Sequence, residues 1–77
     1  MRVTVEIHGR VPTTLQPGTQ SIVLELAEGS TVRAALQALG IAERAPWNAA
    51  VCGKLVGPPD ALHDGDRLLI FEPIGGG

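Results

Sequence analysis

Apolar and polar residues alternate along two stretches of the N-terminal part, and each alternation predicts a half-buried strand. The first stretch is residues 3–7. The second is residues 21–27, where Val23 places an apolar side chain on the polar face. Turn-forming residues separate the two stretches, so we expect residues 9–19 to form a long hairpin connection. The apolar faces are Val3, Val5 and Ile7 in the first strand and Ile22, Leu24 and Leu26 in the second.

The following segment has a helical period instead. Glu28-Gly29-Ser30 ends the second strand, and Ser30 is a favourable N-cap residue. Gly40 is suited to the C-terminal stop of a helix. Between these two signals, one face of the predicted helix carries Val32, Ala35, Leu36 and Leu39. The pattern predicts a three-turn amphipathic helix that packs on a sheet.

The C-terminal half predicts further short strands. We expect one at Ala49–Cys52, which turns at Gly53-Lys54, and another at Leu55-Val56. Leu62 lies within a polar turn and is expected to close the bottom of the core. The last strand is Arg67–Phe71.

This order of elements predicts an α+β fold of the β-grasp type, a roll in which one main helix covers a mixed sheet of four to five strands. The first and last strands would lie side by side in the middle, because the helix supplies the crossover that such a sheet needs. We expect residues 1–72 to form this domain and residues 73–77 to form an extended glycine tail, with Pro73 stiffening the exit.

The composition of the chain excludes several classes of function. The chain has 77 residues, a net charge of −2 and six scattered basic residues, so we expect a small soluble domain that does not bind nucleic acid. No apolar run approaches membrane-spanning length. The single cysteine excludes an internal disulfide and an iron–sulfur cluster, which fits a reducing, cytoplasmic location.

The C-terminus carries the most informative feature of the sequence. Gly75, Gly76 and Gly77 come shortly after the last predicted strand. Glycine has no side chain to pack and loses much entropy when it is ordered. A glycine tail can enter a narrow channel that any other residue would block, so the pattern suggests that the terminal carboxylate is presented to a partner.

Three segments resemble the MoaD/ThiS family of small ubiquitin-like sulfur carriers, most closely its MoaD branch. They are Glu28-Gly29-Ser30-Thr31-Val32, the hairpin Ala50-Val51-Cys52-Gly53-Lys54-Leu55-Val56, and the ending from Leu62-His63-Asp64-Gly65-Asp66 to Gly77. Two positions differ from the family pattern: Cys52 stands where asparagine is usual, and Glu72 stands where molybdopterin-type members often have a second proline.

The resemblance implies a carrier rather than an enzyme. An adenylating enzyme of the MoeB/ThiF type would use ATP to activate the Gly77 carboxylate, and a sulfur donor would then displace AMP to leave a thiocarboxylate. Gly75 and Gly76 would form the thin tail. The chain itself would bind no cofactor and no metal. A large synthase subunit is a further possible partner, and molybdopterin synthesis is the pathway we name first.

The last predicted strand also indicates where a partner docks. If Leu68 and Ile70 face the core, Leu69 and Phe71 lie on the opposite face and stay partly exposed. We therefore expect Leu69, Phe71, Pro73 and Ile74 to bind the partner. Four acidic residues are expected to surround this end and to favour a basic groove: Asp60, Asp64, Asp66 and Glu72.

Several alternatives stay open. Cys52 is more typical of a small structural residue than of a redox group, because no positioned base is visible. His63 with Asp64 and Asp66 suggests ordinary turn chemistry rather than a metal site. Trp47 is either a partner anchor or a cap on the helix and core edge. Two other functions also fit the sequence: a ubiquitin-like modifier joined through Gly77 to lysines, and a β-grasp interaction domain whose tail does nothing chemical.

Overall fold

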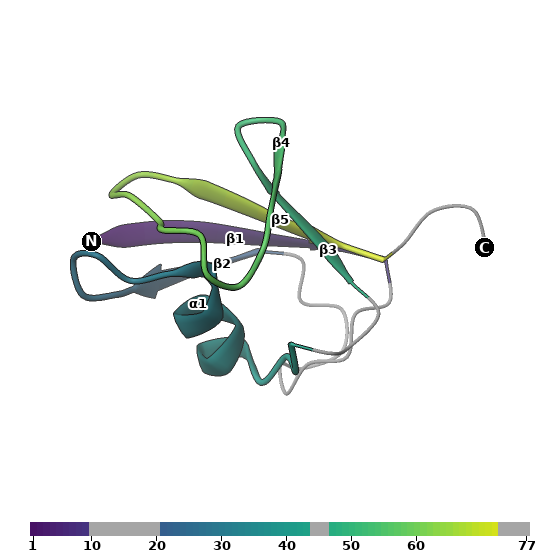
Figure 1. Cartoon of the computed structure of the whole chain (residues 1–77), viewed down its shortest axis with the longest axis horizontal. Helices are drawn as coiled ribbons and strands as arrows, with labels where there is room; N and C mark the ends of the chain where they lie inside the picture. The colour runs from purple at the N-terminus through teal and green to yellow at the C-terminus, as the bar shows by residue number, and fades with distance from the viewer. Residues whose placement is uncertain (10–20, 44–46, 73–77) are drawn as a thin grey trace.

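A computed structural model of the chain describes residues 1–9, 21–43 and 47–72. Within these residues, five strands form a single sheet in the order β2-β1-β5-β3-β4. The central strands β1 and β5 are parallel, and the other neighbours are antiparallel. The predicted mixed sheet with a central pair of terminal strands is confirmed (Figure 1). The elements are β1 Arg2–His8, β2 Ser21–Glu25, α1 Val32–Leu39, β3 Asn48–Val51, β4 Lys54–Val56 and β5 Arg67–Phe71.

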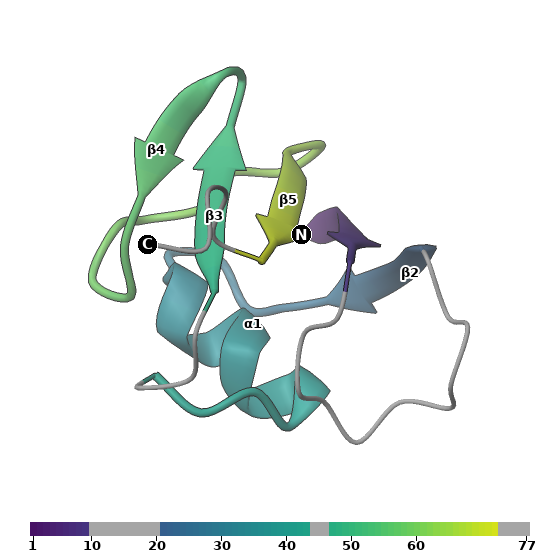
Figure 2. The same cartoon turned by 90° about the vertical axis from the view of Figure 1, so that its right-hand side faces the viewer.

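The helix α1 covers one face of this sheet, and the core lies between the two (Figure 2). The apolar faces of the strands and of the helix meet there as the periodicity predicts, and Leu62 is buried beneath them as expected. Among the described residues, α1 leaves the opposite face of the sheet uncovered (Figure 2). The buried core consists of Val3, Val5, Ile7, Val32, Ala35, Leu36, Leu39, Ile41, Ala49, Leu62, Leu68 and Ile70.

The N-terminus of α1 begins one residue later than predicted. The N-cap is Thr31, not Ser30, and its side chain makes no capping hydrogen bond. The Ser30 carbonyl instead accepts a hydrogen bond from the Leu62 amide at 2.8 Å, so Ser30 belongs to a backbone pairing with the loop before β5. Backbone carbonyls of that loop satisfy the free amides of the helix, because Val32 N donates to Asp60 O and Arg33 N donates to Pro58 O.

α1 ends at Leu39, and Gly40 is its C-cap as predicted, but the eight residues of the helix make about two turns rather than the predicted three. Gly40 has a left-handed backbone with φ of 70°. Its amide donates to the Gln37 carbonyl, and the next amide, of Ile41, donates to the Leu36 carbonyl. These bonds form a Schellman motif. The motif turns Ile41 back onto the core, where its exposed fraction is only 4%. Sequence periodicity missed this residue because it follows the helix.

The turn that joins β3 and β4 lies one residue earlier in the chain than predicted, at Cys52-Gly53 rather than at Gly53-Lys54. Val51 pairs with Lys54, which leaves Cys52 and Gly53 as the two loop residues. Both have positive φ, 52° and 77°, as a type I′ turn requires. The prediction that Cys52 belongs to the strand is therefore wrong. The strand ends one residue earlier, because the pairing register places the turn at Cys52.

Other boundaries differ slightly or lie outside the described residues. β2 ends at Glu25 rather than residue 27, although the Leu26 amide still donates to the Met1 carbonyl at 2.8 Å.

Trp47 packs against the core, and its Nε1 donates to the Ala42 carbonyl at 2.8 Å, which favours its role as a cap on the core edge. The predicted hairpin connection lies outside the described residues except for Gly9. Within the described ranges, no helix is long and apolar enough to cross a membrane.

Candidate docking surface and tail

Strand β5 divides its side chains between the two faces of the sheet. Leu68 and Ile70 are fully buried on the helix side. Leu69 and Phe71 alternate with them and are only half-buried. The prediction that these two residues are partly exposed on the opposite face is confirmed. They lie on the strand that leads into the C-terminal residues.

The pairing register extends this apolar surface across two more strands. Ala50 of β3 lies opposite Leu69, and Leu55 of β4 lies opposite Ala50. Residues that are directly opposite in a ladder project from the same face. Leu55 is 75% exposed. We call Ala50, Leu55, Leu69 and Phe71 the outer patch.

The sequence pattern alone does not assign Ala50 and Leu55 to this surface. Their placement depends on which residue of each strand faces which neighbour, and the turn at Cys52-Gly53 fixes that register. Side chains alternate between the two faces of a hairpin, counted from its two-residue turn. This alternation would have placed both residues on the outer face, but only if the two residues of the turn had been identified correctly.

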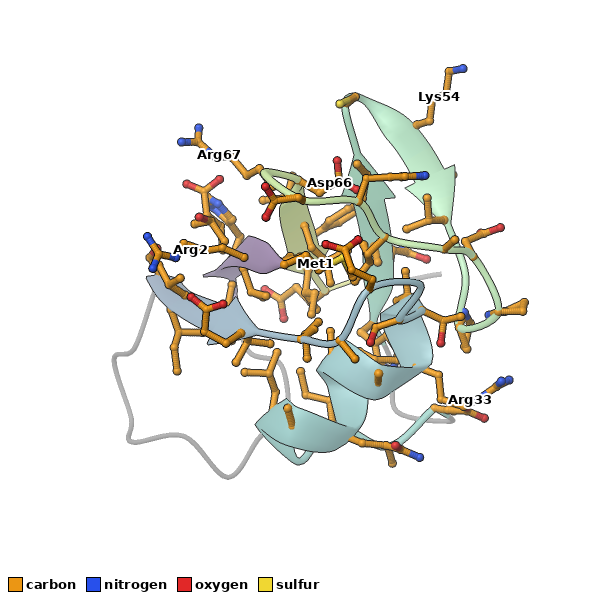
Figure 3. The ribbon with its side chains drawn as sticks, turned by 90° about the vertical axis from the view of Figure 1, so that its left-hand side faces the viewer. Met1, Arg2, Arg33, Lys54, Asp66 and Arg67 are labelled. Carbon is orange, nitrogen blue, oxygen red and sulfur yellow. The ribbon has the colours of Figure 1, made fainter. Side chains whose placement is uncertain are left out.

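Polar groups border the outer patch on the β1 side. Glu6 lies opposite Leu69 across β1 and β5, and its Oε2 is 3.7 Å from Nε of Arg67. Figure 3 shows Arg67 projecting from the sheet on the side away from α1. A shallow hollow of about 270 Å³ lies between this ion pair and the Cys52-Gly53 turn, with Ala50 and Leu69 in its lining. The arrangement offers an apolar surface with one charged border, as protein-binding surfaces often do.

The prediction of an acidic surround at the tail is wrong for three of its four residues. Asp64 and Asp66 lie in the turn before β5, at the end of the strand opposite to Phe71. Figure 3 shows Asp66 at the end of the molecule that carries Met1. Asp60 lies beside the first turn of α1, where its backbone carbonyl accepts from Val32. Of the four, Glu72 alone directly follows β5.

These aspartates have local structural roles. Asp64 Oδ1 accepts a hydrogen bond from the Arg2 amide at 2.7 Å, and Asp66 Oδ2 accepts one from the His63 amide at 2.8 Å. Asp60 Oδ2 accepts from the Gly57 amide at 2.7 Å. The preference for turn chemistry over a metal site at residues 63–66 is consistent with these bonds. Because these aspartates lie away from the start of the tail, they do not support the prediction that the partner's groove is basic.

The other ionisable groups of the described residues add little to the site. Arg2 donates from Nε to Glu25 at 2.8 Å, and this hydrogen bond raises the pKa of the guanidinium above its ordinary value. The group therefore stays cationic. Arg33 forms an ion pair with Glu43 on the surface beside α1. Cys52 is exposed in its turn.

The C-terminal residues that the sequence singles out lie outside the described residues. They are Pro73, Ile74, Gly75, Gly76 and Gly77, and the roles assigned to them stay predictions. The structure does describe Phe71 and Glu72, which directly precede them. Phe71 pairs with His8 of β1 on one side and with Asn48 of β3 on the other, and Glu72 follows. The tail thus begins beside the outer patch.

Comparison with known proteins decides the family. The model of the ThiS family matches residues 10–77, which is most of the chain and includes the three terminal glycines. The chain belongs to the ThiS family of ubiquitin-like sulfur carriers. Small proteins of this family are carriers and not enzymes.

The chain is also similar in sequence to proteins named RnfH. The chain is 38% identical over 65 residues to Protein RnfH of Halorhodospira halophila, an alignment that covers 75% of this chain and 67% of that protein. It is 40% identical over 60 residues to Protein RnfH of Pseudomonas fluorescens, covering 68% and 58%. A third relative of the same name, from Paraburkholderia xenovorans, is 39% identical over 64 residues, covering 74% and 58%. The chain thus spans 58–67% of the length of these curated relatives.

A solved structure confirms the fold. The crystal structure of SAMP1 from Haloferax volcanii superposes with a TM-score of 0.69 over the full length of both chains. The two sequences are only 15% identical, so this likeness concerns the fold alone. The predicted β-grasp, ubiquitin-like fold is confirmed.

Proposed function

We propose that this protein carries sulfur on its C-terminal carboxylate. A carboxylate is a poor electrophile and must first be activated. A carboxylate oxygen of Gly77 would attack the α-phosphate of ATP in the active site of a partner enzyme, which releases pyrophosphate and leaves an acyl adenylate. A hydrosulfide-level sulfur donor would then add to the carbonyl carbon and displace AMP. The product is a Gly77 thiocarboxylate, which passes its sulfur to an acceptor.

The observation that carries this proposal is the extent of the family match. It continues past β5 and includes Gly75, Gly76 and Gly77. A carrier needs a recognisable body and a reactive end, whereas ATP and the catalytic groups belong to the partner. The body described above meets the first requirement, and the glycine tail meets the second.

The outer patch is the surface through which we propose the adenylating partner binds. It crosses three strands, remains uncovered by α1 and borders the start of the tail. Contact there would place the protein body against the partner while Pro73, Ile74 and the glycines extend toward the active site. Leu69 and Phe71 would supply the central contacts, because buried aromatic and aliphatic side chains dominate binding energy at interfaces.

The proposal also names the pathway that receives the sulfur. Residues 71–77 form the ending Phe-x-Pro-(apolar)-x-Gly-Gly, with Gly75 at the second variable position. This ending favours the MoaD-type branch and molybdopterin synthesis in the cytoplasm. On this account a large synthase subunit would receive the charged carrier. The relatives named RnfH are longer than this chain, and their name specifies neither a sulfur acceptor nor a partner.

Terminal variants test the carrier function. Deletion of Gly77, or addition of one residue after it, is expected to abolish adenylation by the partner while the melting temperature stays unchanged. Pyrophosphate release in the presence of ATP and the enzyme reports the first step directly. A variant with an altered terminus that still forms the acyl adenylate would refute the assignment. Lysine-linked conjugates in cell extract would instead support the modifier alternative.

A further inference from the structure

We infer that Gly9 and Glu72 form a positioning pair that fixes where the C-terminal tail leaves the sheet. This inference rests on the proposed function. Gly9 directly follows β1 and Glu72 directly follows β5, and these two strands are parallel neighbours. His8 and Phe71 are the last register pair of this ladder. The two residues therefore emerge next to each other at the end of the sheet where the tail begins.

The side chain of Glu72 occupies the space that a side chain at Gly9 would need. A Cβ built at Gly9 would lie 2.6 Å from Oε1, 2.7 Å from Cδ and 2.8 Å from Cγ of Glu72. Real Cβ atoms do not approach other atoms this closely. The absence of a Cβ at Gly9 thus creates the surface on which the Glu72 side chain rests.

Three other described glycines with positive φ lack such a contact. Gly29, Gly53 and Gly65 also have positive φ, between 77° and 85°, but a Cβ at any of them would meet nothing within 4 Å. Backbone conformation alone explains glycine at these three positions. Gly9 has φ of 78° and also the close approach to Glu72.

The contact has a functional consequence if the carrier is activated at Gly77. The outer patch would hold the body of the protein on its partner, and the terminal carboxylate must then reach one fixed point in the active site. Misplacement of a reacting group by about 1 Å can reduce a rate by up to about a hundredfold. Glu72 directly precedes Pro73, so the contact of its side chain with Gly9 holds the chain at the point from which residues 73–77 continue.

The decisive comparison is between Gly9→Ala and Gly29→Ala. Both substitutions place alanine at nearly the same positive φ, so both impose a similar backbone strain. In Gly9→Ala the new methyl group also displaces the flexible end of Glu72. We expect kcat for adenylation to fall about tenfold in Gly9→Ala. KM for the carrier should stay within about twofold in both variants, because neither changes the outer patch.

Substitutions of Glu72 separate this role from a general effect on stability. Glu72→Gln keeps Cγ, Cδ and Oε1 and is expected to retain the natural kcat. Glu72→Ala removes all three atoms and should lower kcat to the level of Gly9→Ala. The double variant with Gly9→Ala should show no further loss, because both substitutions remove the same contact. Additive losses in the double variant would overturn the inference.

The outcomes also distinguish this inference from the proposed function. If the natural chain is not adenylated by any candidate enzyme, the proposed function fails and the positioning role fails with it. If the natural chain is adenylated and Gly9→Ala behaves like Gly29→Ala, only the positioning role fails. Magnetisation transfer between the Gly9 α-protons and the Glu72 γ-protons in the free protein is an independent readout, and its absence would also overturn the inference.

Discussion

Ala50 of β3 lies directly opposite Leu69 of β5, on the face of the sheet that α1 leaves uncovered. This pairing joins the half-buried side chains of β5 to the exposed Leu55 of β4 and so creates the outer patch. The patch borders the residue from which the C-terminal tail starts. A partner that covers it is therefore well placed to receive the tail.

Two exposed apolar residues on the same face test the docking surface. Leu55 lies in the outer patch, whereas Val23 lies on β2 beyond the Glu6–Arg67 border. Both are more than half exposed, at 75% and 53%, so an aspartate at either position should leave the fold intact. We expect Leu55→Asp to raise KM for adenylation about tenfold, which corresponds to about 1.4 kcal/mol of lost binding.

Val23→Asp is the matched control for this prediction. It places the same charge on the same face of the sheet, but on the far side of β1. KM should then stay close to that of the natural chain. Equal increases in the two variants would indicate a general charge effect and would count against docking through the outer patch.

The turn between β3 and β4 provides a prediction about stability. Cys52 has φ of 52°, a conformation that non-glycine residues adopt only at a cost and that asparagine tolerates best. Cys52→Asn is expected to stabilise the domain by roughly 1 kcal/mol. For a domain of this size, that corresponds to an increase in melting temperature of about 4–8 °C.

Cys52→Ala serves as the control for the turn. It removes the thiol but keeps a residue that is unsuited to positive φ, so its melting temperature should not increase. Thermal unfolding of both variants under reducing conditions separates the two effects. If alanine stabilises the domain as much as asparagine does, the thiol rather than the turn conformation is responsible.

Adjacent leucines on β5 test the assignment of faces. Leu68 has no exposed surface, whereas Leu69 is half-buried. We expect Leu68→Ala to lower the free energy of unfolding by about 2–5 kcal/mol, because it leaves a cavity in the core. Leu69→Ala should cost clearly less and should weaken partner binding instead. Denaturant unfolding of the two variants measures the difference, and equal losses would contradict the register of β5.

Much of the fold could be predicted because periodicity reports burial directly. The alternation of Val3, Val5 and Ile7 and the helical spacing of Val32 to Leu39 each determine one buried face. The half-exposure of Leu69 and Phe71 followed from the same reasoning applied to β5. These features depend only on residues that are near one another in the chain.

The features that could not be predicted depend on distant segments. Thr31 replaces Ser30 as the N-cap because the loop before β5 supplies backbone carbonyls to the helix and pairs with Ser30. The aspartates near residue 64 were misplaced because proximity in sequence to β5 does not show at which end of the strand they lie. Gly9 and Glu72 are near opposite ends of the chain, so local sequence patterns could not predict that Glu72 approaches Gly9.

The central claim is tested most directly by the intact mass of the protein after incubation with ATP, a sulfide source and an adenylating enzyme of the MoeB/ThiF type. The account predicts a mass gain equal to the replacement of one oxygen by sulfur, localised to Gly77 by fragmentation. An unchanged mass, with enzymes that convert another carrier to its thiocarboxylate under the same conditions, would contradict it.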